Sequence, residues 1–157
     1  MNASAKQFVV REHIEGIVSN VFNTMLNLKA TPATAGLLRS ERVSGVIGIG
    51  GEHASATVYV HLPEALARDI TRSLLQSIDG QSIGDNEVND VAGELSNMIG
   101  GTLKSKLNDA DIFCAMSTPS VIRGAFAVEA PPGVRAEMFY FNCLGKRFAV
   151  EVHLQLN

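Results

Sequence analysis

The chain has 157 residues, of which 46% are hydrophobic and 18% charged, a composition typical of one soluble globular domain. Intrinsic disorder and fibrous classes are excluded, and a fold of this size buries enough surface to need neither disulfides nor a metal for stability. Thirteen basic and sixteen acidic residues give a net charge of -3, and the basic residues are scattered, which argues against a nucleic-acid partner.

The beginning of the chain lacks the charged leader, apolar run and small-residue cleavage site of a signal peptide. No stretch approaches the roughly 18 consecutive apolar residues of a membrane span. We therefore expect a cytoplasmic protein without a membrane segment. Cys114 and Cys143 lie far apart within apolar stretches typical of strands, which favours two buried thiols over a disulfide or a metal pair.

The first half of the chain is predicted to hold a long helix, a β-hairpin and a short helix. Apolar residues recur every three or four positions in both helices, whereas the hairpin strands are apolar runs that meet at a glycine-rich turn. In chain order we expect a helix over residues 8–28, a connection over 31–41, strands over 43–50 and 54–62, and a helix that begins at Pro63 and ends at Asp79 and Gly80.

The second half begins with the longest periodic segment, a predicted helix over residues 86–107. Asp85 is its expected N-cap, and Glu87 adds favourable charge to its first turn. Beyond it we expect, in chain order, extended segments at 112–116 and 125–129 on either side of a Ser-Thr-Pro-Ser connection, and a hairpin of two alternating strands, 135–144 and 147–155, joined by Gly145.

Strands follow each long helix as hairpins rather than as strand-helix-strand crossovers. This order predicts an α+β layered fold, in which a mostly antiparallel sheet packs against two long helices and a short one. A helix followed by strands occurs twice, which hints at an internal duplication. Residues 1–157 are expected to form a single domain.

Three other kinds of site have little support in the sequence. A glycine-rich run at residues 48–51 has His53 where a dinucleotide loop needs its third glycine, and a strand follows it, so we interpret the run as a hairpin turn. Ser44, Ser55 and the other serines lack the strand-to-helix elbow of a nucleophile. The histidines show no metal-ligand spacing; they are His13, His53, His61 and His153.

The helix predicted over residues 86–107 has two contrasting faces. At about 100° per residue, six apolar side chains fall within about 120° of arc and form the core face: Val88, Val91, Ala92, Leu95, Ile99 and Leu103. Glu94 and Asn97 are neighbours on the opposite side, with their Cβ atoms about 5–6 Å apart. They belong to an exposed row made of Asp90, Glu94, Asn97, Gly101 and Lys104.

A solvated helix face is the simplest explanation of such a row, because charged and amide side chains belong there. Gly93, Gly100 and Gly101 favour a further role, since each glycine costs about 1 kcal/mol relative to alanine inside a helix. Their missing side chains would let another protein approach the Asn97 amide. Close packing on the strands explains Gly93 and Gly100 equally well.

The run DVAGELSNMIGG at residues 90–101, followed by STPSVIRG at 117–124, resembles the CheX branch of the CheC/CheX/FliY phosphatases of bacterial chemotaxis. The resemblance covers nearly the whole chain. It implies a fold with internal pseudo-symmetry, dimerisation through sheet edges, and an enzyme that removes the phosphoryl group from the aspartate of a CheY-like receiver domain.

Two features depart from the fuller CheC pattern. Pro119 comes 22 positions after Asn97, one earlier than the spacing expected of CheC. The first helix has Glu15 and Asn20 five positions apart, which does not make a second Glu-x-x-Asn. The sequence therefore predicts one site, as in CheX.

Within the resemblance, Glu94 and Asn97 are the expected catalytic residues. The Asn97 amide can accept a hydrogen bond from water and donate one to water or to a phosphoryl oxygen, and phosphoryl transfer depends mainly on such positioning. An exposed carboxylate is a poor general base, so we expect Glu94 to dock on the active-site lysine of the receiver instead. Mg²⁺ would come with the receiver, and this chain would carry no cofactor of its own.

Partner contacts at the rim are expected from Asp90, Gly101 and Lys104, and Pro119 is expected to shape a loop. Two other classes stay open. A non-catalytic module of the same fold would dock a receiver without accelerating hydrolysis. A structural dimer or a flagellar-switch-like component would use the C-terminal hairpin, where Met138 and Tyr140 alternate along a strand that also makes a homodimer plausible.

Overall fold

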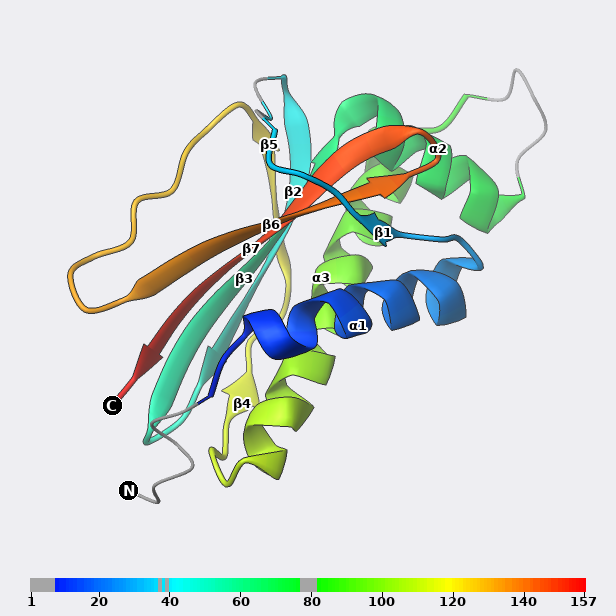
Figure 1. Ribbon diagram of the computed structural model, residues 1–157. Helices are drawn as coiled ribbons and strands as arrows, with labels where there is room; N and C mark the ends of the chain where they lie inside the picture. Colours follow the sequence, from blue (N-terminus) through cyan, green and yellow to red (C-terminus); the bar gives the residue numbers. More distant parts are fainter. Residues whose placement is uncertain (1–7, 37, 39, 77–81) are drawn as a thin grey trace.

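One antiparallel sheet with helices on one face makes up the described chain, which comprises residues 8–36, 38, 40–76 and 82–157 of this computed structural model (Figure 1). In chain order its elements are α1 (Arg11–Val21), the π-helical turn η2 (Phe22–Leu26), β1 (Thr31–Pro32), β2 (Arg42–Gly50), β3 (Ala54–Pro63), α2 (Glu64–Leu75), α3 (Asp85–Asp109), β4 (Ala115–Met116), β5 (Ser120–Gly124), β6 (Arg135–Cys143) and β7 (Lys146–Leu156).

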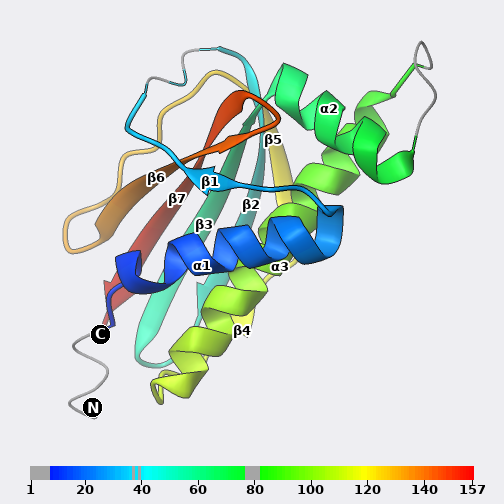
Figure 2. The same cartoon turned by 45° about the vertical axis from the view of Figure 1, so that its right-hand side comes forward.

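The strands follow the order β1-β6-β7-β3-β2-β4, and β5 also pairs with β2. Every pairing is antiparallel. Both views place α1, α2 and α3 on the same side of the sheet, where α1 crosses α3 (Figures 1 and 2). The predicted α+β architecture is therefore confirmed. The long helices α1 and α3 each bury one apolar face, whereas strands β2 and β7 are buried on both faces.

The sheet has the same strand order from either edge once equivalent strands of the two halves of the chain are exchanged. This order reveals the internal pseudo-symmetry. Each half consists of a helix, a short edge element and a hairpin: α1, β1 and β2–β3 in the first, α3, β4–β5 and β6–β7 in the second. The edge element of each half pairs with the hairpin of the other, since β1 pairs with β6 whereas β4 and β5 pair with β2. The two helices also share a sequence repeat, GIVSN at residues 16–20 and GELSN at residues 93–97.

The core lies between the sheet and the helices. Phe22 and Phe148 stack with their ring centroids 4.8 Å apart, and Phe141 stacks on Phe148 at 5.4 Å, which joins η2 to the β6–β7 hairpin. Cys143 is buried and Cys114 is half-buried, and both are free. Burial raises the pKa of each thiol. Cys143 is a buried thiol in β6, as predicted, whereas Cys114 precedes β4 and is not fully buried. Among the described helices, none is long and apolar enough to cross a membrane.

Two predicted helix ends need correction. The first helix begins at Arg11 rather than at residue 8, and its last turn widens into η2 before Asn27 takes a left-handed conformation. Asp85 is not the N-cap of α3: Gly84 occupies that position, and the Asp85 carboxylate lies 2.6 Å from the Arg68 guanidinium instead. A tertiary ion pair has therefore replaced the expected local cap. The predicted stop at Asp79 and Gly80 lies outside the described residues.

The strand after α3 also differs from expectation. Residues 120–124, predicted to start as a connection, form β5 and pair with β2, whereas the expected extended segment at 125–129 is not a strand. Gly124 has a φ of +126°, a conformation that lets the chain turn away from the sheet at this point. β1 was not predicted because its two residues pair with distant Phe141 and Asn142, which local periodicity does not reveal.

Candidate active site

Helix α3 lies close against β2 because two glycines remove side chains from the contact. A Cβ atom on Gly45 of β2 would overlap the backbone oxygen of Ala92, and one on Gly100 of α3 would lie 2.5 Å from Cγ2 of Ile47. Close packing on the sheet, one of the two explanations considered for Gly100, therefore accounts for this glycine. The six predicted core residues of α3 are all buried.

The β4–β5 segment covers one flank of α3. Pro119 and Val121 lie beside Gly93, and Met116 lies beside Gly101, each 3.6–3.9 Å from the position that a Cβ atom on the glycine would take. Asp90 and Glu94 are exposed, but Gly101 is half-buried. The predicted exposed row is thus open at its N-terminal end and partly covered by β4 at its C-terminal end.

Lys104 belongs to this covered end of the row. It is half-buried, and its charge acts on the Cys114 thiol, whose pKa is nonetheless raised because burial outweighs the lysine. Lys104 is thus less exposed than a residue of an open row would be. Asp90, Glu94 and Asn97 follow one another along the outer side of α3 at spacings of three and four residues.

Glu94 and Asn97 lie one turn apart on the outer side of α3. Glu94 is exposed and Asn97 is half-buried. Within the part of the chain that the structure describes, neither side chain has a hydrogen bond or an ion pair. A carboxylate and an amide that no internal partner occupies are both available to a ligand or a second protein.

Pro119 belongs to the loop between β4 and β5, on the Asn97 side of the helix. The backbone N–H of Gly48 donates to the Ser117 hydroxyl at 2.9 Å, and the Ser117 N–H donates to the Gly48 carbonyl at 2.8 Å. These two bonds fasten the start of the loop to β2. Pro119, two residues further along this loop, lies beside Gly93, the residue before Glu94.

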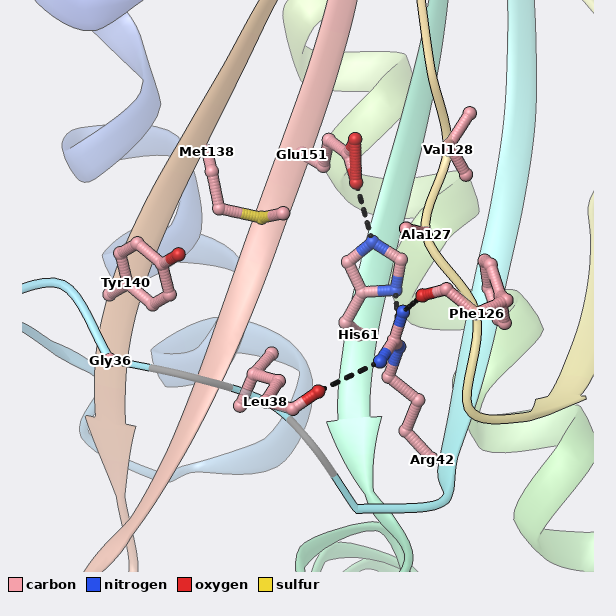
Figure 3. Close-up of a pocket in the computed structure, with 10 residues that line it drawn as sticks. All are labelled: Gly36, Leu38, Arg42, His61, Phe126, Ala127, Val128, Met138, Tyr140 and Glu151. Atoms are coloured by element: carbon pink, nitrogen blue, oxygen red, sulfur yellow. Dashed lines mark hydrogen bonds and ion pairs between the residues drawn. The ribbon is translucent and has the colours of Figure 1, made fainter.

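A second polar cluster lies on the sheet face away from the helices (Figure 3). The Arg42 Nε donates to His61 Nδ1 at 3.2 Å, so His61 carries its proton on Nε2 and donates it to a Glu151 carboxylate oxygen at 3.0 Å. His153 Nε2 donates to the other Glu151 oxygen at 2.7 Å. Neighbouring strands β2, β3 and β7 thus hold one chain of hydrogen bonds.

This cluster has the arrangement of a group that stabilises the structure. Arg42 also donates to the carbonyl oxygens of Leu38 and Phe126, and its guanidinium lies 4.5 Å from the Phe126 ring. Burial lowers the pKa of Arg42 in spite of the attraction of Glu151. The charged groups of the cluster bind one another. Because Arg42 also binds a carbonyl oxygen in each of two connecting segments, the cluster holds these segments against the sheet.

Sequence patterns alone did not identify this cluster. The alternation in residues 147–155 carries the signal, because Glu151 and His153 occupy the positions that face away from the helices. Both are buried, so polar residues in a strand of this kind need partners from neighbouring strands. In the described residues, no group of three or more His, Cys, Asp or Glu side chains is arranged to hold a metal ion.

Several solved structures share this fold. The chemotaxis protein CheX from Vibrio vulnificus has a TM-score of 0.76 and 24% identity over 89% of this chain and 95% of that one. A CheC-like superfamily protein from Shewanella sp. PV-4 has a TM-score of 0.76 and 26% identity over 99% of both chains. CheX from Borrelia burgdorferi, solved in a complex with CheY, BeF3 and Mg²⁺, has a TM-score of 0.73 and 18% identity over 95% of this chain and 99% of that one.

A sequence family assigns the chain more narrowly than the fold. The family described as "Chemotaxis phosphatase CheX" matches residues 43–142, which include Glu94 and Asn97. The chain therefore belongs to the CheX family of chemotaxis phosphatases. No match was found among curated protein sequences.

Proposed function

We propose that this protein is a phosphatase that accelerates hydrolysis of the phospho-aspartate of a CheY-like receiver domain. The observation that carries the proposal is the pair on α3: Glu94 and Asn97 stand side by side, face outward and have no partner among the described residues. Membership in the CheX family supports the same activity. The complex of Borrelia CheX with CheY supports a receiver as the partner.

Asn97 is the proposed water-positioning residue. Its carbonyl oxygen accepts a hydrogen bond from the attacking water, and its amide group donates to a phosphoryl oxygen. The water oxygen forms the new bond to phosphorus while the bond from phosphorus to the aspartate oxygen breaks. The bonding electrons return to the aspartate carboxylate, and inorganic phosphate leaves. Because the transition state is loose, orientation and charge stabilisation provide most of the acceleration.

Glu94 is the proposed docking residue. Its exposed carboxylate has no cation partner within the described chain and can bind the active-site lysine of a receiver through a charge-assisted hydrogen bond. The proposal assigns Mg²⁺ to the receiver; a solved complex of Borrelia CheX with CheY, BeF3 and Mg²⁺ supports the presence of the ion in such a complex. The proposal includes a cytoplasmic location, because the substrate is a signalling protein.

The other residues of the exposed row contribute to the rim of this interface; they are Asp90, Gly101 and Lys104. Asp90 is exposed one turn before Glu94 and is the best placed of the three proposed contacts. Gly101 and Lys104 are half-buried beside β4, so a partner reaches them only at the edge of its contact area. Exposed charge pairs at such a rim contribute roughly 0–1 kcal/mol each.

The decay of a phosphorylated receiver, measured with Mg²⁺ and catalytic amounts of this protein, tests the proposal. We expect Asn97→Ala to lower the acceleration by about 100-fold, the effect of losing one transition-state hydrogen-bonding group. Glu94→Ala should raise the receiver concentration needed for half-maximal rate. Asn20→Ala is the matched control, because Asn20 is exposed on α1 in the equivalent repeat GIVSN.

Full activity in Asn97→Ala would contradict the assigned role of the amide. Binding without any acceleration by the wild type would instead assign the protein to the non-catalytic receiver-binding class. Glu94→Ala and Asn97→Ala both lie on the outer side of α3, so the free energy of unfolding should change by no more than about 0.5 kcal/mol. Thermal unfolding should therefore confirm that both variants are folded.

We also propose a homodimer formed through the edge of β6. β1 pairs with only Phe141 and Asn142, and residues 135–139 have no strand partner on that edge among the described residues. A second copy could pair there and extend the sheet across two chains. The half-exposed Met138 and the nearby Tyr140 would then contribute apolar contact area.

A further inference from the structure

An apolar groove adjoins the Glu94 and Asn97 pair. Four apolar side chains from three elements line it: Met25 of η2, Leu74 and Leu75 at the end of α2, and Val91 of α3. The groove has a volume of about 350 Å³, which is enough for several side chains. The elements that line it are in contact, since α2 packs against both α3 and η2. Figure 2 shows α2 beside the N-terminal half of α3.

The leucines of this groove are more exposed than their position on α2 requires. Leu66 and Ile70 cover the inner side of the helix and are fully buried, whereas Leu74 is 37% exposed and Leu75 is 51% exposed. Met98, 38% exposed, extends apolar surface one turn beyond Glu94. Neighbouring exposed apolar side chains beside a polar site are typical of a protein contact surface.

Acidic side chains line one side of the groove. Glu87, Asp90 and Glu94 recur along α3 at spacings of three and four residues, so they form one acidic rim. Within the described chain, none of the three forms an ion pair. Three carboxylates without internal counter-charges attract a basic side chain from outside.

The rim joins the groove to the proposed active site. Glu94 belongs to both, since it lines the groove and stands one turn from Asn97. A receiver that places its phosphoryl group beside Asn97 therefore also covers the groove. Of the possible occupants, a receiver is the one that this continuity and the acidic rim favour.

From these observations we propose that the groove docks an apolar side chain of the receiver domain, with a neighbouring basic residue on the acidic rim. The inference rests on the proposed function, which identifies the receiver as partner. The groove residues bind the receiver and set its position, while Asn97 acts on the phosphoryl group. Loss of groove contacts should therefore weaken binding and leave the rate at saturation unchanged.

The test measures affinity for a receiver held in its activated state by beryllofluoride and Mg²⁺, together with hydrolysis of the phosphorylated receiver. We expect Leu75→Gln to weaken binding about tenfold and to raise the half-saturating receiver concentration by the same factor, with kcat preserved. Leu144→Gln is the matched control, since Leu144 is 48% exposed in the β6–β7 turn. Glu87→Gln should reduce the salt dependence of binding.

The outcomes separate the two proposals. Unchanged affinity in Leu75→Gln, or an equal loss in Leu144→Gln, would overturn the docking groove, even where Asn97→Ala abolishes hydrolysis. Binding that depends on Leu75 without any acceleration of hydrolysis would support the groove and reject the phosphatase function. A wild-type protein that neither binds nor dephosphorylates a receiver would overturn both. Circular dichroism of Leu75→Gln establishes that the variant is folded.

Discussion

Asn20 and Asn97 occupy equivalent positions in two repeats, but only Asn97 has a carboxylate one turn before it. Ile17 stands where Glu94 stands in the second repeat, and Ile17 is buried whereas Glu94 is exposed. The equivalent position therefore differs between the two helices. In α1 its side chain packs into the core, and in α3 its side chain is exposed at the surface. This difference explains why the chain holds one candidate pair rather than two.

Glu151 shows how a single residue can couple stability to pH. Burial by itself raises the pKa of this carboxyl group, but the hydrogen bonds that it accepts from His61 and His153 outweigh burial and lower it. A carboxyl group with a lowered pKa in the folded state stabilises the protein above its ordinary pKa of about 4.3, and this contribution disappears as the pH falls through the lowered value.

Glu151→Gln tests this coupling. We expect the variant to lose about 1–3 kcal/mol of unfolding free energy at neutral pH, because two hydrogen bonds lose their charged acceptor. Below the ordinary carboxyl pKa, the difference between wild type and variant should shrink. Urea unfolding at a series of pH values measures it, and a difference that stays constant down to acid pH would contradict the role of the Glu151 charge.

At the scale of elements, the placement of α3 depends on glycines in the strand beneath it. Gly45→Ala should destabilise the protein by roughly 3 kcal/mol, because the new methyl group overlaps the Ala92 carbonyl oxygen and approaches Ser96 Oγ at 2.9 Å. Gly16→Ala provides the opposite case: it lies exposed in α1 with nothing within 4 Å of the new Cβ. This change should stabilise the protein by about 1 kcal/mol.

Chemical denaturation of both variants measures the two effects. If Gly45→Ala unfolded at the same urea concentration as the wild type, the close contact between α3 and β2 would be wrong. A destabilised Gly16→Ala would show that the exposed face of α1 carries a contact beyond the described residues.

At the scale of the whole molecule, the two halves depend on each other. The edge element of each half completes the hairpin of the other, so neither helix-and-hairpin unit has its own finished sheet. The edge strands themselves are short, since β1 and β4 have two residues each and β5 has five. Short edge strands leave the neighbouring strand open for part of its length, as β6 is over residues 135–139.

This open edge predicts the oligomeric state. Sedimentation velocity should show a dimer at micromolar concentration that dissociates on dilution, because the proposed contact is a strand pairing with limited apolar area. A protein that stays monomeric across the whole range would contradict pairing through β6. Hydrogen exchange in β6 should slow as the dimer forms, and unchanged exchange there would place the interface elsewhere.

The sequence by itself determined the long elements and the identity of the candidate pair. Apolar periodicity sufficed for α1 and α3, which each bury one face, and apolar or alternating runs bounded by glycine turns sufficed for both hairpins. Glu94 and Asn97 could be found because the core face of one helix defines its outer face. The residues that carry the proposed chemistry are also the residues of the Glu-x-x-Asn motif.

Only the tertiary structure decided what surrounds that pair. Residues far apart in the chain meet at β5, at the Arg42, His61 and Glu151 cluster, and in the apolar groove, and no local pattern records such contacts. The same holds for Asp85, which a distant arginine engages in place of its expected capping role. Local periodicity reports which face of an element is buried, whereas the packing of elements determines which exposed residues stay open to a partner.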